Sequence, residues 1–105
     1  MTSEATSFKI GVLGCGNVGA ALVDLVATQR VSVFERTGID LEVTRVAVRN
    51  MSAPRDVDLA EGVLTRAAMA VVTDPDVDIV VESIGGIEPA RELILAALTH
   101  GKPVV

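Results

Sequence analysis

The feature that most constrains this 105-residue chain is a glycine-rich junction at residues 10–19, Ile-Gly-Val-Leu-Gly-Cys-Gly-Asn-Val-Gly. A short apolar run precedes glycines at 14, 16 and 19, and a helical pattern starts directly after them. Gly14 suits a tight strand-to-helix turn, Gly16 allows a ligand to approach the backbone, and Gly19 allows the helix to pack on a sheet. The spacing predicts a strand–turn–helix unit that binds a dinucleotide pyrophosphate at the helix N-terminus.

Apolar periodicity extends this unit into an alternating chain. The expected strands are residues 8–13, 41–48, 63–64 and 78–82, with a further strand beginning at 103–105. Three helices are expected. The first starts after Gly16 and runs to about Phe34, with a stop signal at Thr37-Gly38, and the second starts at an N-cap on Thr65. The third runs from Pro89 to Leu98, with a stop signal at His100-Gly101. A polar stretch from Asn50 to Glu61 is expected to form a surface loop. The alternation predicts an α/β fold: a Rossmann-type doubly wound, mostly parallel sheet with helices on both faces.

Composition agrees with one such domain over residues 1–105. Half of the residues are hydrophobic, with two Phe and no Tyr or Trp, which suits a parallel sheet covered on both faces. No apolar run approaches the roughly 20 residues that cross a bilayer. The polar segment Met1–Ser7 lacks the regions of a signal peptide, so we expect a cytoplasmic protein. A net charge of −5 without an aromatic stacking surface argues against nucleic acid as a partner.

The tip of the second strand bears on the type of cofactor. Sites selective for NAD usually place Asp or Glu there to bind the ribose hydroxyls. This chain has Val48-Arg49-Asn50 instead, and an arginine fork binds a 2′-phosphate that a carboxylate would repel. The sequence therefore favours NADP, with NAD possible. The alternative, that Arg49 is only a solvated charge at a strand end, stays open.

The loop after the buried strand 78–82 is a second candidate contact. Ser83, Ile84, Gly85 and Gly86 are expected at the carboxyl edge beside the first strand, where their backbone would contact a ribose or the nicotinamide. Glu82 either belongs to this contact or is a structural acid that caps a neighbouring helix.

Other candidates favour structural roles. Cys15 lies near a helix N-terminus, which can activate a thiol, but no second cysteine and no evident histidine pairs with it, so we expect a small filler. A single cysteine also excludes an internal disulfide and a CxxC metal site. His100 is expected on the surface at a helix end. Asp74, Asp76 and Asp78 are expected in a solvated loop and not at a metal.

Together these segments resemble the N-terminal nucleotide-binding domain of homoserine dehydrogenase. The matching stretches are residues 11–19, 46–50, 76–88 and 101–105. The resemblance implies an oxidoreductase that interconverts L-aspartate 4-semialdehyde and L-homoserine with NADPH or NADH, on the route to threonine and methionine. It also implies that Asn17 and Val18 contact the phosphates, Arg49 the 2′-phosphate, and Ser83 to Gly86 the nicotinamide side. Cys15 departs from the family pattern, in which many members have a hydrophobic residue.

Members of that family continue past the equivalent of Val105 with Thr-Ala-Asn-Lys and a substrate domain that carries the acid/base lysine and aspartate. The resemblance therefore implies the N-terminal part of a longer, homodimeric enzyme, inactive as this chain alone. The predicted cofactor-binding residues are Gly14, Cys15, Gly16, Asn17, Val18, Gly19, Val48, Arg49, Ser83, Ile84, Gly85 and Gly86, with no catalytic and no metal-binding residue.

Three alternatives remain at this point. One is another NAD(P)-dependent amino-acid or semialdehyde dehydrogenase with a similar first half. A second is a nucleotide-sensing regulatory module, which would usually have an acid where Arg49 stands. A third is a structural domain that binds no nucleotide.

Overall fold

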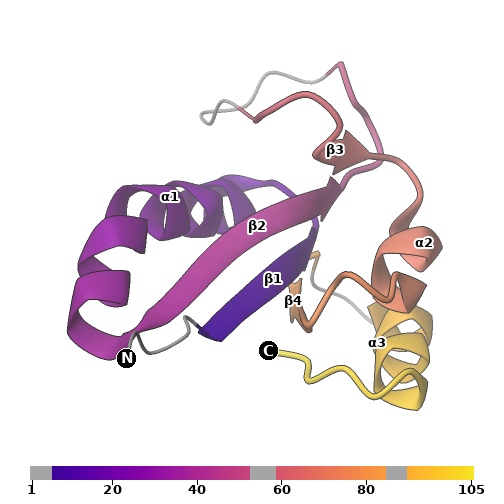
Figure 1. Cartoon of the computed structure of the whole chain (residues 1–105). Helices are drawn as coiled ribbons and strands as arrows, with labels where there is room; N and C mark the ends of the chain where they lie inside the picture. The colour runs from indigo at the N-terminus through magenta and orange to yellow at the C-terminus, as the bar shows by residue number, and fades with distance from the viewer. Residues whose placement is uncertain (1–5, 53–58, 85–89) are drawn as a thin grey trace.

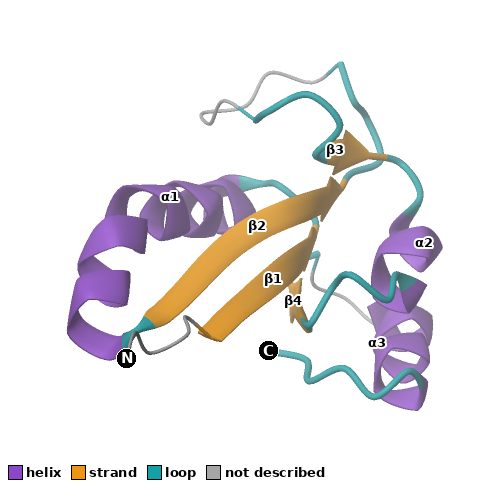
Figure 2. Cartoon of the chain, in the orientation of Figure 1, coloured by secondary structure: helices purple, strands orange, loops and turns teal. Residues whose placement is uncertain are grey.

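The computed structural model describes residues 6–52, 59–84 and 90–105 of the chain as a parallel sheet flanked by helices (Figures 1 and 2). The strands are β1 (Thr6–Leu13), β2 (Ile39–Ala47), β3 (Leu64–Thr65) and β4 (Ile79–Glu82), and the helices are α1 (Asn17–Thr37), α2 (Ala68–Thr73) and α3 (Ala90–Thr99). The strand order is β3-β2-β1-β4, and every paired strand is parallel. The predicted α/β fold with a doubly wound sheet is confirmed.

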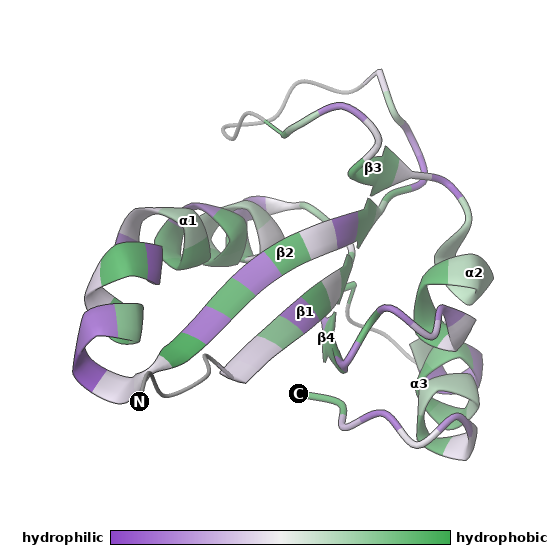
Figure 3. Ribbon diagram, in the orientation of Figure 1, coloured by the Kyte–Doolittle hydropathy of each residue, from purple (hydrophilic) through white to green (hydrophobic). Residues whose placement is uncertain are grey.

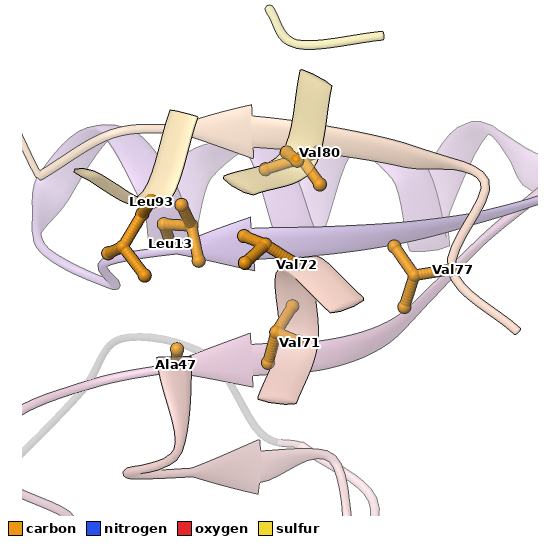
Figure 4. Packing of buried hydrophobic residues seen from close by; sticks show 8 residues of the cluster. Leu13, Ala47, Val71, Val72, Val77, Val80 and Leu93 are labelled. Atoms are coloured by element: carbon orange, nitrogen blue, oxygen red, sulfur yellow. The ribbon is translucent and has the colours of Figure 1, made fainter. Parts of the chain in front are cut away.

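The two faces of the sheet have separate apolar cores because side chains alternate along a strand. Ile10 and Val12 of β1 belong to a cluster with Val23 of α1, whereas Leu13 belongs to a cluster with residues of α2 and α3. Figure 4 shows the second cluster, which consists of Leu13, Ala47, Val71, Val72, Val77, Val80, Leu93 and Ala97. The alternation of apolar and polar residues is visible along β2 in Figure 3. Helices therefore cover both faces, as the sequence predicts.

The predicted helix ends are largely correct. Gly38 follows α1 in the left-handed conformation, with φ of 75°, and its N–H donates to the Phe34 carbonyl. Gly101 has the same φ behind α3. His100 is exposed, and its Nδ1 lies 2.8 Å from the Ala96 oxygen, which agrees with a surface position at a helix end.

Several predicted boundaries differ from the structure. β1 and β2 each begin two residues earlier than expected, β2 ends one residue earlier, and β3 is displaced by one residue. The prediction that Thr65 caps α2 is wrong, because Thr65 ends β3 and the N-cap is Ala67. The Thr65 hydroxyl instead accepts the Ala67 N–H at 3.1 Å, which satisfies a donor in the strand-to-helix connection. Pro89 and residues 53–58 of the predicted loop lie outside the described residues.

The segment 103–105 extends the sheet beside β4, as expected for the beginning of a strand. Val104 forms a parallel bridge with Val80, and the Glu82 N–H donates to the Val105 oxygen at 2.9 Å. Strands therefore continue on both sides of β1. In such a sheet the crevice between the carboxyl ends of the strands on either side of this reversal is the usual ligand site.

The buried side chain of Lys102 fixes the start of this segment. Its Nζ donates to the Val77 carbonyl at 2.7 Å, just before β4. Within the described ranges, none of the helices has the length and apolarity required to span a bilayer.

Candidate functional site

The glycine-rich turn joins the carboxyl end of β1 to α1. Gly14 has φ of 93°, which a residue with a side chain rarely adopts, and a Cβ there would lie 3.1 Å from the Ile84 backbone nitrogen. The Gly14 N–H donates to the Ala47 oxygen at 2.7 Å, and the Ser83 N–H donates to the Leu13 oxygen at 2.9 Å. The turn is thus held between β2 and β4.

The other two glycines of the motif have opposite surroundings. A Cβ on Gly19 would lie 2.5 Å from the Gly14 oxygen and 2.9 Å from the Ser83 Oγ, so glycine permits the close approach of α1 to the turn. A Cβ on Gly16 would have no neighbour within 4 Å, and the φ of Gly16 is an ordinary −78°. Nothing in the described fold fills the space beside Gly16, which leaves it accessible to a ligand.

The N-terminus of α1 suits an anion. Gly16 is the N-cap and has no side chain to accept a hydrogen bond, and the first turn contains no acidic residue. The first N–H groups of a helix lack partners inside it and lie at the positive end of its dipole. Asn17 and Val18 begin the helix at the surface, with Val18 73% exposed, so their amides are open to a ligand from this side.

Cys15 lies between the turn and the core. Its half-buried side chain packs against the cluster of Ile10, Val12, Val23 and Val46. This packing agrees with the expected filler role, because it directs the thiol toward apolar side chains.

A cavity of about 740 Å³ lies at the carboxyl edge of the sheet, a volume typical of a small-molecule site. The described residues that line it are Gly14, Gly16, Ala47, Val48, Arg49, Arg66, Ala68, Ser83, Ile84 and Leu93. Six of the predicted cofactor-binding residues are therefore brought together around one space. Cys15, Asn17, Val18 and Gly19 adjoin it without lining it, and Gly85 and Gly86 lie outside the described residues.

Arg66 is a lining residue that the sequence analysis missed. It directly follows β3, which is paired with β2 through Ala47 and Thr65, so Arg66 and Arg49 leave adjacent strands at the same edge. No carboxylate is found among the described lining residues. The signal was available in principle, because neighbouring parallel strands deliver the residues that follow them to a common rim.

The acidic candidates mostly have structural partners. The Asp74 carboxylate accepts the Asp76 N–H at 2.8 Å, and the Asp78 carboxylate accepts the Lys9 N–H at 2.7 Å. Glu82 is half-buried at the end of β4 and does not line the cavity. Asp74 thus stabilises the turn before β4, and Asp78 joins the start of β4 to β1.

Comparison with known proteins decides the family. Residues 14–105 match the family model described as "Homoserine dehydrogenase, NAD binding domain". The chain belongs to this family. The match covers the glycine turn and the three strands that follow it, so the predicted resemblance to homoserine dehydrogenase is confirmed, and the domain is one that binds a nicotinamide cofactor.

Relatives of known sequence carry the same name. A homoserine dehydrogenase from Synechocystis is 47% identical over 98 residues, and one from Corynebacterium glutamicum is 46% identical over 96 residues. These alignments cover 92% and 91% of this chain but only 22% and 21% of the relatives.

Solved structures agree. A homoserine dehydrogenase from S. aureus matches 96% of this chain and 25% of its own with a TM-score of 0.88 and 29% identity. One from Thiobacillus denitrificans matches 98% of this chain and 24% of its own with a TM-score of 0.84 and 39% identity. The chain thus spans about a quarter of its relatives' length. These matches favour the homoserine dehydrogenase family over the other dehydrogenases and sensor modules considered above.

Proposed function

We propose that this homoserine dehydrogenase domain binds NADP(H) in preference to NAD(H). In this proposal the pyrophosphate lies against the glycine turn and the N-terminus of α1, and the 2′-phosphate lies between Arg49 and Arg66. The observation that carries the proposal is the composition of the cavity, where two arginines and no carboxylate stand among the described lining residues.

The residues present fit the pyrophosphate. The open space beside Gly16 allows phosphate oxygens to approach the backbone, which a side chain at that position would obstruct. Helix amides and the dipole of α1 supply partial positive charge without the desolvation of a buried side chain. The remaining predicted contacts, including the backbone amide of Cys15 and the amides of Asn17 and Val18, belong to this proposal.

The two arginines fit a phosphate on the adenosine ribose. A guanidinium presents several donors in a planar fork and stays charged at any physiological pH. Arg49 alone is compatible with a solvated strand end, but Arg66, which directly follows the neighbouring strand β3, doubles the positive charge on the same cavity. A dianionic 2′-phosphate forms charge-assisted hydrogen bonds with both guanidinium groups, whereas the neutral 2′-hydroxyl of NAD adds little binding free energy there.

We further propose that the longer protein interconverts L-homoserine and L-aspartate 4-semialdehyde. When bound, the cofactor would supply or accept the hydride, and Ser83 and Ile84 at the end of β4 would lie on its nicotinamide side. In this proposal the substrate domain and the acid/base residues belong to the part of the longer protein that this chain does not span, since the chain covers 22% and 25% of two of its relatives. A homodimer of the longer protein is part of the same proposal. The cytoplasmic location remains a prediction from sequence.

The test is a pair of titrations with NADPH and NADH, followed by nicotinamide fluorescence. Arg49→Gln and Arg66→Gln should each weaken NADPH binding by about tenfold, since a hydrogen bond to a charged group contributes roughly 1.5–3 kcal/mol and exposure reduces it. NADH affinity should change by less than about twofold. Arg36→Gln is the matched control, because Arg36 lies in the last turn of α1, where its guanidinium donates to the Ser32 carbonyl, and it does not line the cavity. Equal losses for both cofactors would remove the arginines from the explanation.

A further inference from the structure

The side chain of Ser83 points back into the glycine turn. Its Oγ lies 3.0 Å from the Leu13 oxygen and 3.0 Å from the Gly14 oxygen, although 69 residues separate Ser83 from Gly14. The Ser83 N–H also donates to the Leu13 oxygen at 2.9 Å. A single residue at the end of β4 therefore contacts two consecutive carbonyls of the turn.

The geometry of the peptide bond links the Ser83 contact to the direction of the Cys15 N–H. In a trans peptide the C=O and the N–H that follows it point in opposite directions. The Leu13–Gly14 peptide shows this, because its oxygen faces Ser83 and its N–H donates to Ala47 on the opposite side. In the next peptide the Gly14 oxygen faces Ser83 and Gly19, so the Cys15 N–H points away from them.

Gly14 has no side chain and accepts backbone conformations closed to other residues. The orientation of the Gly14–Cys15 peptide therefore depends on the contacts that its neighbours make with it, among them those of Ser83 and Gly19. In the reversed orientation the Gly14 oxygen would face outward and repel a phosphate. The Ser83 hydroxyl is a donor that stabilises only the orientation with the oxygen inward.

We infer that Ser83 is a positioning residue for pyrophosphate binding, which it supports by holding the Gly14–Cys15 peptide with its N–H toward the cofactor. This inference rests on the proposed binding of NADP(H) at the glycine turn. Ser83 acts through the turn and not through its own contact with the nicotinamide, which changes the role expected from sequence. The half-buried hydroxyl is well placed for this, because it lies on the cavity wall and on the turn at once.

The test compares Ser83→Ala with Thr99→Val. The Thr99 hydroxyl also donates to a carbonyl, that of Leu95 at 2.8 Å, but on an exposed helix outside the cavity. Two probes are titrated: NADPH, which has the pyrophosphate, and 2′-AMP, which has the adenosine and 2′-phosphate without it. Ser83→Ala should weaken NADPH by about three- to tenfold, the usual effect of one hydrogen bond, and leave 2′-AMP within about twofold. Thr99→Val should change neither.

A second readout does not depend on any ligand. In ¹⁵N NMR spectra of the free protein, Ser83→Ala should shift or broaden the Cys15 amide, and Thr99→Val should not. Unchanged NADPH affinity, an equal loss for both probes, or an undisturbed Cys15 amide would each overturn the inference. If the unaltered protein fails to bind NADPH, the proposed function fails, whereas the amide measurement still decides whether Ser83 orients the turn.

Discussion

Gly19→Ala tests the geometry of the turn through stability. The added Cβ would lie 2.5 Å from the Gly14 oxygen, so α1 and the turn must separate by about 0.9 Å to reach ordinary contact at 3.4 Å. Overpacking of this kind costs about 1–3 kcal/mol, and the better helix propensity of alanine returns less than about 1 kcal/mol. We therefore expect the free energy of unfolding to fall by about 1–2 kcal/mol, because the obstructing atom is a backbone oxygen that cannot rotate away.

Gly16→Ala is the matched comparison, because it adds the same atom three residues earlier in open space. Its φ of −78° suits alanine, and the loss of glycine at an N-cap costs less than about 1 kcal/mol. In the proposed binding mode the new methyl group occupies the side from which the phosphates approach, so NADPH affinity should fall at least about tenfold, or 1.4 kcal/mol.

Urea unfolding and NADPH titration of both variants separate the packing role of Gly19 from the ligand-access role of Gly16. Gly19→Ala should show the larger loss of stability, and Gly16→Ala should show a loss of affinity without a matching loss of stability. Two results would refute the reasoning: a Gly16→Ala protein that binds NADPH normally, or one that is destabilised as much as Gly19→Ala.

Three further variants probe other contacts. The hydrogen bond with Arg30 lowers the pKa of Asp40, so the stability that this carboxylate contributes is present above its unfolded pKa and is lost as pH falls. Asp40→Asn should therefore have a lower free energy of unfolding than wild type at pH 7. In urea unfolding at acid pH this difference should disappear. Lys102→Met keeps the aliphatic stem but removes the donor to the Val77 carbonyl, and should lower the free energy of unfolding by about 1–3 kcal/mol in urea. An unchanged free energy of unfolding would show that this hydrogen bond does not stabilise the fold. In the double variant Ser83→Ala with Arg49→Gln, losses of NADPH affinity should add within about 0.5 kcal/mol, because they act on opposite ends of the adenosine diphosphate; strong coupling would contradict separate sites.

The part of the site that could be predicted from sequence is the part encoded in short segments. The turn at Gly14 and the strand tip at Arg49 can each be recognised from a few residues. The signals are the spacing of the glycines and the residue type that follows an apolar run. The same holds for the alternation of strands and helices and for the glycine that ends α1. The prediction of a Thr65 cap failed because Thr65 lies two residues before the N-cap, where its hydroxyl accepts the Ala67 N–H in a turn.

The missed features depend on contacts between segments distant in sequence. Arg66 enters the cavity only because β3 pairs with β2 in a particular register, and strand register is weakly visible in a two-residue strand. The Ser83 hydroxyl finds its acceptors 69 and 70 residues earlier, so neither local pattern nor composition indicates which way it points.

The strand order places different groups of residues at different sides of the same cavity. β1 lies between β2 and β4, so its glycine turn is flanked by the arginine edge of β2 and β3 on one side and by the Ser83 edge of β4 on the other. In the proposed complex, each edge would contact a different portion of an extended dinucleotide whose pyrophosphate lies at the centre. We therefore expect substitutions at Arg49 and Arg66 to change the preference between NADP and NAD, while the turn proposed to bind the pyrophosphate keeps its geometry. Changes at Ser83 should instead affect both cofactors alike, since both contain the pyrophosphate.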